Sequence, residues 1–216
     1  RLLAHTFGAG DELDLYYAAF RIPDLMFVLF VSVLSVYVLL PFVTKAREAD
    51  GAKAGAHVLG QMFTVFLVCY SVIALVLFFA TPYLVSVFFP GLADHFETLI
   101  VLIRILLLQP FLLGVSSLFG VVTQLSHRFI LYAISPLVYN VGIILGIVVL
   151  YPHFGMRGLV IGVVVGALGH MLVQLPLVSK SDFAFGLAKS FDYKLMKSIL
   201  LVAIPRALTL SIHQLV

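Results

Sequence analysis

The sequence predicts an all-α fold, a polytopic transmembrane helix bundle. Four runs are each about as long as the ~20 residues that a helix needs to cross a bilayer, and none contains an acidic residue: 58–80, 98–122, 129–150 and 158–178. The runs are apolar around nearly their whole circumference, whereas a helix at the surface of a water-soluble domain has a polar face. With 62% hydrophobic residues, 11% charged residues and a mean hydropathy of +1.17, an ordinary water-soluble domain is excluded.

Further helices are expected on either side of these four runs. A helix tail covers residues 1–5, a long helix covers about residues 15–43, and a last helix begins at about residue 196. Residues 179–194 mix the apolar side chains of Phe183, Phe185, Leu187 and Phe191 with charged ones, so they form either an interfacial helix or an ordinary cytoplasmic connector. Because the chain begins at Arg1 and ends within an apolar segment, we expect it to be a piece of a larger protein.

Lysine and arginine in the loops predict the orientation. One set of alternating loops carries eight of these residues and the opposite set carries only Arg157. The first set is 45–57, 124–128 and 179–197, and the second is 6–14, 81–97 and 151–157. Since positive charge favours the cytoplasmic side, the first set is predicted to be cytoplasmic.

Four charged residues within or against the apolar runs are candidates for a substrate-binding cavity: Arg21, Asp24, Arg104 and Arg206. An arginine at mid-bilayer costs at least ~2.5 kcal/mol unless it faces water or a partner. Arg104 could instead extend to the outer headgroups. Arg21 and Asp24 share one helix face, so they form either a neutral pair or part of a cationic cavity.

Prolines and glycines within the runs predict bends and close helix packing. Pro110, Pro136, Pro176 and Pro205 each remove a backbone donor. Glycines recur at helical spacing in two neighbouring runs, at positions 142 and 146 and at positions 158, 162, 166 and 169. Such spacing allows two helix backbones to approach closely, which suits a bundle that bends during a transport cycle.

Several other functions find no support in the residues. His170 and His213 are isolated from other ligand residues and Cys69 is the only cysteine, so no metal and no cofactor are predicted. No span combines a nucleophile with a base, so an enzyme is not expected. The formal charge of +3 reflects the loop bias, which gives no basis for nucleic-acid binding.

Residues near the start resemble the opening of a known transporter family. The segment 7–10 reads Phe-Gly-Ala-Gly, and residues 16–24 read Tyr-Tyr-Ala-Ala-Phe-Arg-Ile-Pro-Asp. Phe89-Pro90-Gly91-Leu92, Arg128-Phe129 and Gln174-Leu175-Pro176 follow in the expected order. Over nearly its whole length the chain is similar to the MurJ (MviN) family of lipid II flippases, in the multidrug/oligosaccharidyl-lipid/polysaccharide exporter superfamily.

This resemblance implies a two-lobed helical transporter of the bacterial inner membrane that alternates between inward and outward states. Residues 1–178 would form the first lobe, residues 179–195 a cytoplasmic connector and residues 196–216 the start of the second lobe. The implied cargo is lipid II or a similar undecaprenyl-diphosphate-linked glycan of peptidoglycan synthesis, with a possible coupling ion. Cavity arginines would bind the diphosphate, because guanidinium stays charged and donates paired hydrogen bonds.

The chain departs from the family pattern after the proline motif. The family usually has a paired arginine there, where this chain has Phe27-Val28. Other cargo-binding arginines of the family would fall before Arg1 or after Val216. Arg21 matches a commonly basic position, while Arg104 and Arg206 rest only on their place in the spans.

Three functions follow from these observations. A lipid-linked glycan flippase is favoured by the motif order and the intramembrane arginines. A cation-coupled exporter of small molecules would need carboxylates inside the spans, and only Asp24 qualifies. A membrane scaffold that binds a partner or lipid without moving it is favoured by the missing arginine pair.

Overall fold

The computed structural model describes residues 10–181 and 186–215, with side chains as far as Pro205. In this part of the chain the regular elements are all helical, which confirms the predicted all-α class; the helix tail expected at residues 1–5 lies outside it. In order, the elements are α2 (Asp11–Val31), α3 (Val36–Asp50), α4 (Ala52–Phe88), the short 3₁₀ helix η1 (Pro90–His95), α5 (Phe96–Leu106), α6 (Leu108–Leu125), α7 (Phe129–Leu145), the π-helical segment η2 (Gly146–Leu150), α8 (Tyr151–Phe154), α9 (Met156–Leu172), α10 (Leu175–Lys180) and α11 (Tyr193–Leu215).

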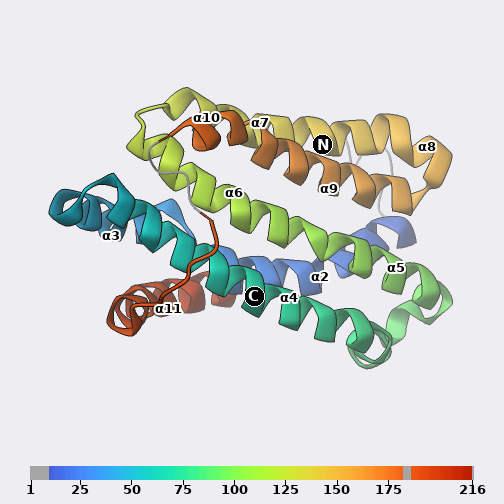
Figure 1. The fold of residues 1–216 in the computed structure, drawn as a ribbon. Helices are drawn as coiled ribbons and strands as arrows, with labels where there is room; N and C mark the ends of the chain where they lie inside the picture. Colours follow the sequence, from blue (N-terminus) through green and yellow to red (C-terminus); the bar gives the residue numbers. More distant parts are fainter. Residues whose placement is uncertain (1–9, 182–185, 216) are drawn as a thin grey trace.

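Within the described residues, five helical segments are long and apolar enough to cross a membrane. They are Asp11–Asp50, Ala52–Phe88, Pro90–Leu125, Phe129–Phe154 and Met156–Lys180. These segments run lengthwise through one bundle, with the turns at its two ends (Figure 1). Helix α9 packs against α5, α6 and α7, and α2 packs against α5 and α6, so the bundle is one connected set of spans.

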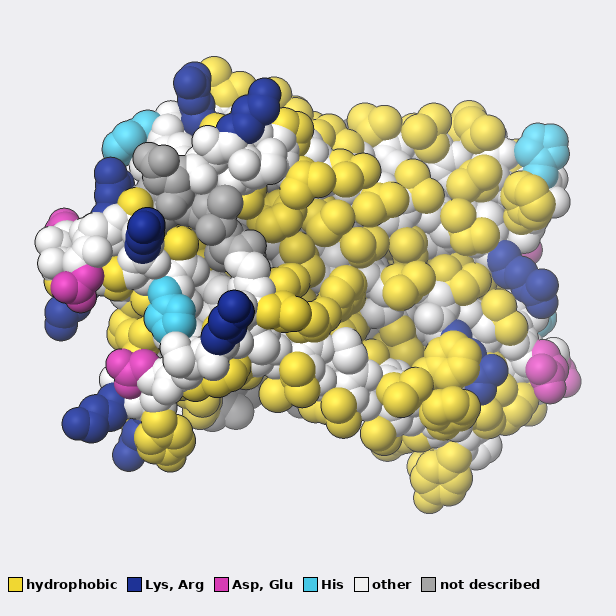
Figure 2. Space-filling model, viewed as in Figure 1, with side chains coloured by type: hydrophobic (Ala, Val, Ile, Leu, Met, Phe, Trp, Pro, Cys, Tyr) yellow, Lys and Arg dark blue, Asp and Glu magenta, His cyan; other side chains and the backbone are white. Residues whose placement is uncertain are grey.

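The surface of the bundle has the pattern of a membrane protein. Apolar side chains cover the middle of the face shown in Figure 2, and most charged side chains gather at its two ends. On α4, Val72, Val76, Phe79 and Tyr83 are all more than half exposed. Water would disfavour a continuous apolar surface of this extent, whereas lipid or another set of helices accepts it.

The observed helices depart from the predicted boundaries at three breaks. The helix expected over residues 15–43 is interrupted after Val31, where the Ser32 hydroxyl donates to the Val28 carbonyl oxygen. The run 98–122 is divided at Leu107, and the run 158–178 is divided just before Leu175. In the last two cases a proline, Pro110 or Pro176, lies in the first turn of the following helix, where a missing N–H costs nothing.

The charged loop predicted at residues 45–57 is mostly helical. Helices α3 and α4 enter it from both sides and meet at Gly51, whose φ of 80° ends α3. Glycine accepts this backbone conformation without a steric penalty. The sequence pattern marks where the apolar layer ends, but a helix can continue beyond that layer into water.

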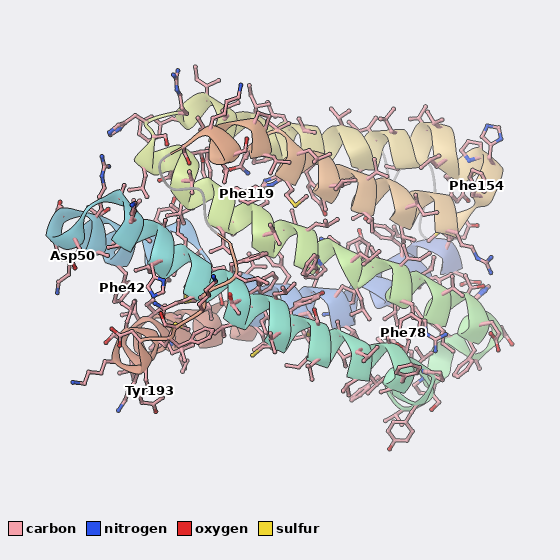
Figure 3. The ribbon with its side chains drawn as sticks, viewed as in Figure 1. Phe42, Asp50, Phe78, Phe119, Phe154 and Tyr193 are labelled. Carbon is pink, nitrogen blue, oxygen red and sulfur yellow. The ribbon has the colours of Figure 1, made fainter. Side chains whose placement is uncertain are left out.

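The two sets of loops used for the orientation lie at opposite ends of the bundle. Figure 3 places Asp50, the last residue of α3, at one end and Phe154, the last residue of α8, at the other. Figure 2 shows most of the Lys and Arg side chains of this face at the Asp50 end. The segregation agrees with alternating spans, while the assignment of the Asp50 end to the cytoplasm stays a prediction.

The segment between α10 and α11 is not helical where the structure describes it. Helix α10 continues to Lys180, residues 182–185 are not described, and residues 186–192 form a non-helical connection. The described part therefore fits an ordinary connector better than an interfacial helix. The last predicted helix is present as α11.

Candidate functional site

A cavity of about 820 Å³ lies between α2 and α4. One wall is the α2 face that carries Tyr17, Arg21 and Asp24, and the facing wall is apolar and comes from α4. The other lining residues are Phe20, Ile22, Leu25, Met26, Leu29, Ile73, Leu77, Leu84, Phe88 and Phe89. The charged residues among those that line this otherwise apolar cavity are Arg21 and Asp24.

Arg21 and Asp24 are brought together at this cavity. They lie three residues apart on α2, on either side of the buried Pro23, and their charges attract each other. Arg21 is exposed within this chain, and Asp24 is half-buried. Arg21 lies six residues after Leu15, where the apolar part of α2 begins, which is about 9 Å along the helix axis at ~1.5 Å per residue, so the pair lies inside the apolar part of the span.

Arg104 lies elsewhere and does not line this cavity. It is half-buried in the last turn of α5, where its Nε donates to the Phe78 carbonyl oxygen at 3.1 Å and its guanidinium carbon lies 4.5 Å from the centre of the Phe78 ring. Phe78 belongs to α4 (Figure 3). These contacts join α5 to α4, which gives Arg104 a place in helix packing.

Arg206 belongs to α11, immediately after Pro205. Its side chain, like that of His213, lies outside the part of the structure that is described. A cavity role for Arg206 remains a sequence-based prediction.

Aromatic and amide side chains that the sequence analysis did not select lie in the neighbourhood of Asp24. Tyr16 and Tyr139 lie near enough to interact with its charge, and the Gln109 amide nitrogen donates to the Tyr139 hydroxyl at 3.1 Å. Gln109 is 5% exposed. In the sequence, the polar Gln109 stands directly before Pro110 within an apolar run, and this is the feature that could have pointed to a buried hydrogen bond.

His170 takes part in a hydrogen-bonded network between α6 and the end of α9. The Ser116 hydroxyl oxygen lies 2.6 Å from His170 Nδ1 and accepts from the Gln174 amide at 2.8 Å. The Thr123 hydroxyl donates to the side-chain amide oxygen, Oε1, of Gln174 at 3.3 Å. These hydrogen bonds place His170 in a packing contact between α6 and α9.

The missing arginine pair falls on the same helix as the cavity. Phe27 and Val28 follow Asp24 on α2, and Val28 is 5% exposed. Their neighbours Met26 and Leu29 line the cavity. The part of the cavity wall toward the end of α2 is therefore apolar. The positive charge of the cavity wall comes from Arg21.

A cavity with a charged group, held between apolar spans, places the chain in the class of multi-pass helical membrane proteins that includes transporters of amphipathic molecules. The family comparison is more specific, because the model described as "Lipid II flippase MurJ" matches residues 3–216. The chain belongs to this family. It is accordingly a multi-pass protein of the bacterial inner membrane.

Individual relatives support the same assignment. The lipid II flippase MurJ of Burkholderia cenocepacia is 26% identical over 99% of this chain and 43% of its own length. The probable lipid II flippase MurJ of Rhizobium tropici is 30% identical over 99% of this chain and 42% of its own length. That of Thermotoga maritima is 29% identical over 81% of the chain and 36% of its own length. The chain thus spans about two fifths of the first two relatives.

Proposed function

We propose that the protein to which this chain belongs is a flippase that moves lipid II, or a similar undecaprenyl-diphosphate-linked glycan, from the cytoplasmic to the outer leaflet. The observation that carries the proposal is the α2/α4 cavity with Arg21 in its wall, in a chain of the MurJ family. The headgroup of such a lipid is anionic and hydrophilic, while its tail is apolar. A charged site inside an apolar bundle suits the headgroup, and the tail stays in the bilayer.

Arg21 would attract the diphosphate and donate hydrogen bonds to its oxygens. Asp24 lies on the same wall, and its charge moderates the attraction. Moderate binding is useful to a transporter, because a headgroup held too tightly would not be released on the other side. Movement would come from alternating access, in which residues 1–178, the first lobe, rock against a second lobe that begins at residues 196–216 beyond the connector 179–195.

This proposal takes the protein as a transporter and not an enzyme, in line with relatives that are named flippases. A coupling ion would supply energy for transport, and the residues described here do not indicate which ion it would be. The apolar Phe27-Val28 pair favours a second candidate, a membrane scaffold that binds a lipid without moving it. The two candidates differ in transport and can be separated by measuring it.

The test is the appearance of lipid II in the outer leaflet of cells depleted of their own flippase, after expression of the full-length protein. We expect the parent to restore flipping, and Arg21→Ala and Arg206→Ala each to reduce it about tenfold or more, the effect of losing a hydrogen bond to a charged group. Arg157→Ala is the matched control, because Arg157 is exposed at the start of α9 and belongs to none of the family motifs. A well-inserted parent that moves no lipid II would instead favour a scaffold or another cargo.

A further inference from the structure

After α10 the chain crosses α4 to reach α11. Figure 1 shows this connection passing over α4 without forming a helix of its own. Residues 186–192 make up its last part, and most of them are exposed. A short segment with no internal helical hydrogen bonds keeps one path only if other elements hold it.

Side chains of α4 supply these hydrogen bonds. The backbone N–H of Ala188 donates to Thr64 Oγ1 at 2.8 Å, and the backbone N–H of Asp192 donates to Gln61 Oε1 at 2.9 Å. Between them, the Ser190 hydroxyl lies 3.5 Å from His57 Nε2. Both backbone donors in the first two contacts are thus satisfied by a side chain of the same helix.

The three α4 side chains lie on one face. Positions 57, 61 and 64 follow the i, i+4, i+7 spacing that aligns residues along an α-helix. Gln61 is only 1% exposed, and burying an amide without a partner is unfavourable. The bond from Asp192 gives the Oε1 atom of this buried glutamine a partner at the place where the connector ends, while its Nε2 atom has none among the described residues.

Gly60 allows the connector to approach the backbone of α4 on the same face. A Cβ atom at position 60 would lie 2.8 Å from the Gly186 carbonyl oxygen, closer than a methyl group and an oxygen can come without displacement. Gly60 therefore lets the connector come close to α4 at residue 186, and the polar side chains of α4 bind it between residues 188 and 192.

Asp192 links this contact to the start of α11. Its Oδ1 accepts from the backbone N–H groups of Lys194 and Leu195 at 2.9 and 3.1 Å, the arrangement of a helix N-cap. One turn further on, Ile199 and Ala203 are fully buried in the core that α11 shares with α2 and α3. The residue that α4 holds through its backbone is also the residue that begins α11.

We propose that His57, Gln61 and Thr64 are positioning residues that hold the connector on α4 and thereby fix where α11 starts against α2 and α3. The contact attaches the start of α11, where the second lobe begins, to the first lobe, and so gives the rocking motion a fixed point. Its effect on transport rests on the proposed flippase function. The contact between residues 186–192 and α4, here called the holding contact, does not rest on that function and can be tested separately.

The first test is trypsin cleavage after Lys189, an exposed residue inside the held segment, followed by mass spectrometry in the purified full-length protein. Gln61→Ala and Thr64→Ala are expected to speed this cleavage roughly three- to tenfold, the factor by which the loss of one or two hydrogen bonds favours local opening. Thr64→Ser keeps the acceptor oxygen and should cleave like the parent. Ser71→Ala, an exposed position further along α4, is the control.

The second test measures lipid II flipping by the same variants. Gln61→Ala and Thr64→Ala should reduce transport at unchanged expression, and Thr64→Ser should restore it. Unchanged cleavage after Lys189 in both alanine variants would overturn the holding contact, whatever the transport result. Faster cleavage with normal transport would keep the contact and reject its role in the cycle, and a parent that flips no lipid II would refute the proposed function alone.

Discussion

Arg104 of α5 donates a hydrogen bond from Nε to the carbonyl oxygen of Phe78 on α4 at 3.1 Å. In an unbroken helix this carbonyl would accept from the N–H of residue 82, but residue 82 is a proline and has none. The arginine thus satisfies the backbone acceptor that Pro82 leaves free. Its position over the Phe78 ring adds a cation–π contact.

This relationship predicts a non-additive effect of two substitutions. Arg104→Met keeps an apolar chain but removes the donor, and should destabilise the parent by about 1 kcal/mol, as for other hydrogen bonds between membrane helices. In a Pro82→Ala background the new backbone N–H at position 82 can bond to the Phe78 carbonyl oxygen, so the same change should cost less. Thermal unfolding of the purified full-length variants measures this coupling. Equal costs in both backgrounds would show that the carbonyl left free by Pro82 is not what Arg104 stabilises.

The contact between η2 and α9 predicts a steric effect. A Cβ atom on Gly146 would lie 2.9 Å from the Gly162 Cα, so Gly146→Ala forces the two backbones apart. Overpacking of this kind typically costs about 1–3 kcal/mol, and the unfolding temperature should fall accordingly. Gly91→Ala is the control, because nothing lies within 4 Å of a Cβ atom there. A Gly146→Ala variant as stable as the Gly91→Ala control would contradict the close approach.

The sequence alone predicts the spans because their signal is local. Twenty apolar residues in a row identify a membrane helix whatever it packs against, and the glycine spacing on α7 and α9 indicates their close contact. The breaks at Ser32 and Leu107 were not predicted. At Leu107 the carbonyl oxygen accepts a hydrogen bond from the Tyr70 hydroxyl of α4 at 2.5 Å, a contact between residues 37 positions apart that no local pattern contains.

The candidate site divides in the same way. Arg21 and Asp24 could be grouped from the sequence because they lie on one helix, three residues apart. The sequence could not show that Arg104 lies outside the cavity, because its position along the span does not indicate which side of the helix it occupies. The structure turns Arg104 toward α4 and Phe78. The signal that distinguishes it was present in Pro82, four residues after Phe78, but only the fold shows that the two helices meet.

The network around Gln174 predicts that this residue stabilises the junction of α9 and α10. Gln174→Leu removes the hydrogen bonds to Ser116 and Thr123, while Ser116 keeps His170 and Thr123 keeps the Gly120 carbonyl oxygen as partners. The loss of these two hydrogen bonds should cost about 1–3 kcal/mol. Asn140→Leu is the matched control, because the exposed Asn140 donates only to Pro136 of its own helix in the contacts observed. Chemical denaturation of the full-length protein compares them. Similar stabilities of the two variants would show that the network contributes nothing measurable.

The loop charges predict which end of the bundle faces the cytoplasm. In a Cys69→Ala background, a membrane-impermeant maleimide should label Asp94→Cys in intact cells, because the loop between α4 and α5 carries no lysine or arginine. Ser126→Cys, in the turn before Arg128, should react only after the membrane is opened, since positive loops remain inside. The parent protein, which keeps Cys69, is a separate control: this cysteine lies midway along α4, within the apolar layer, and should stay unlabelled. Labelling of Ser126→Cys in intact cells, with Asp94→Cys protected, would invert the bundle and move the Asp50 end outside.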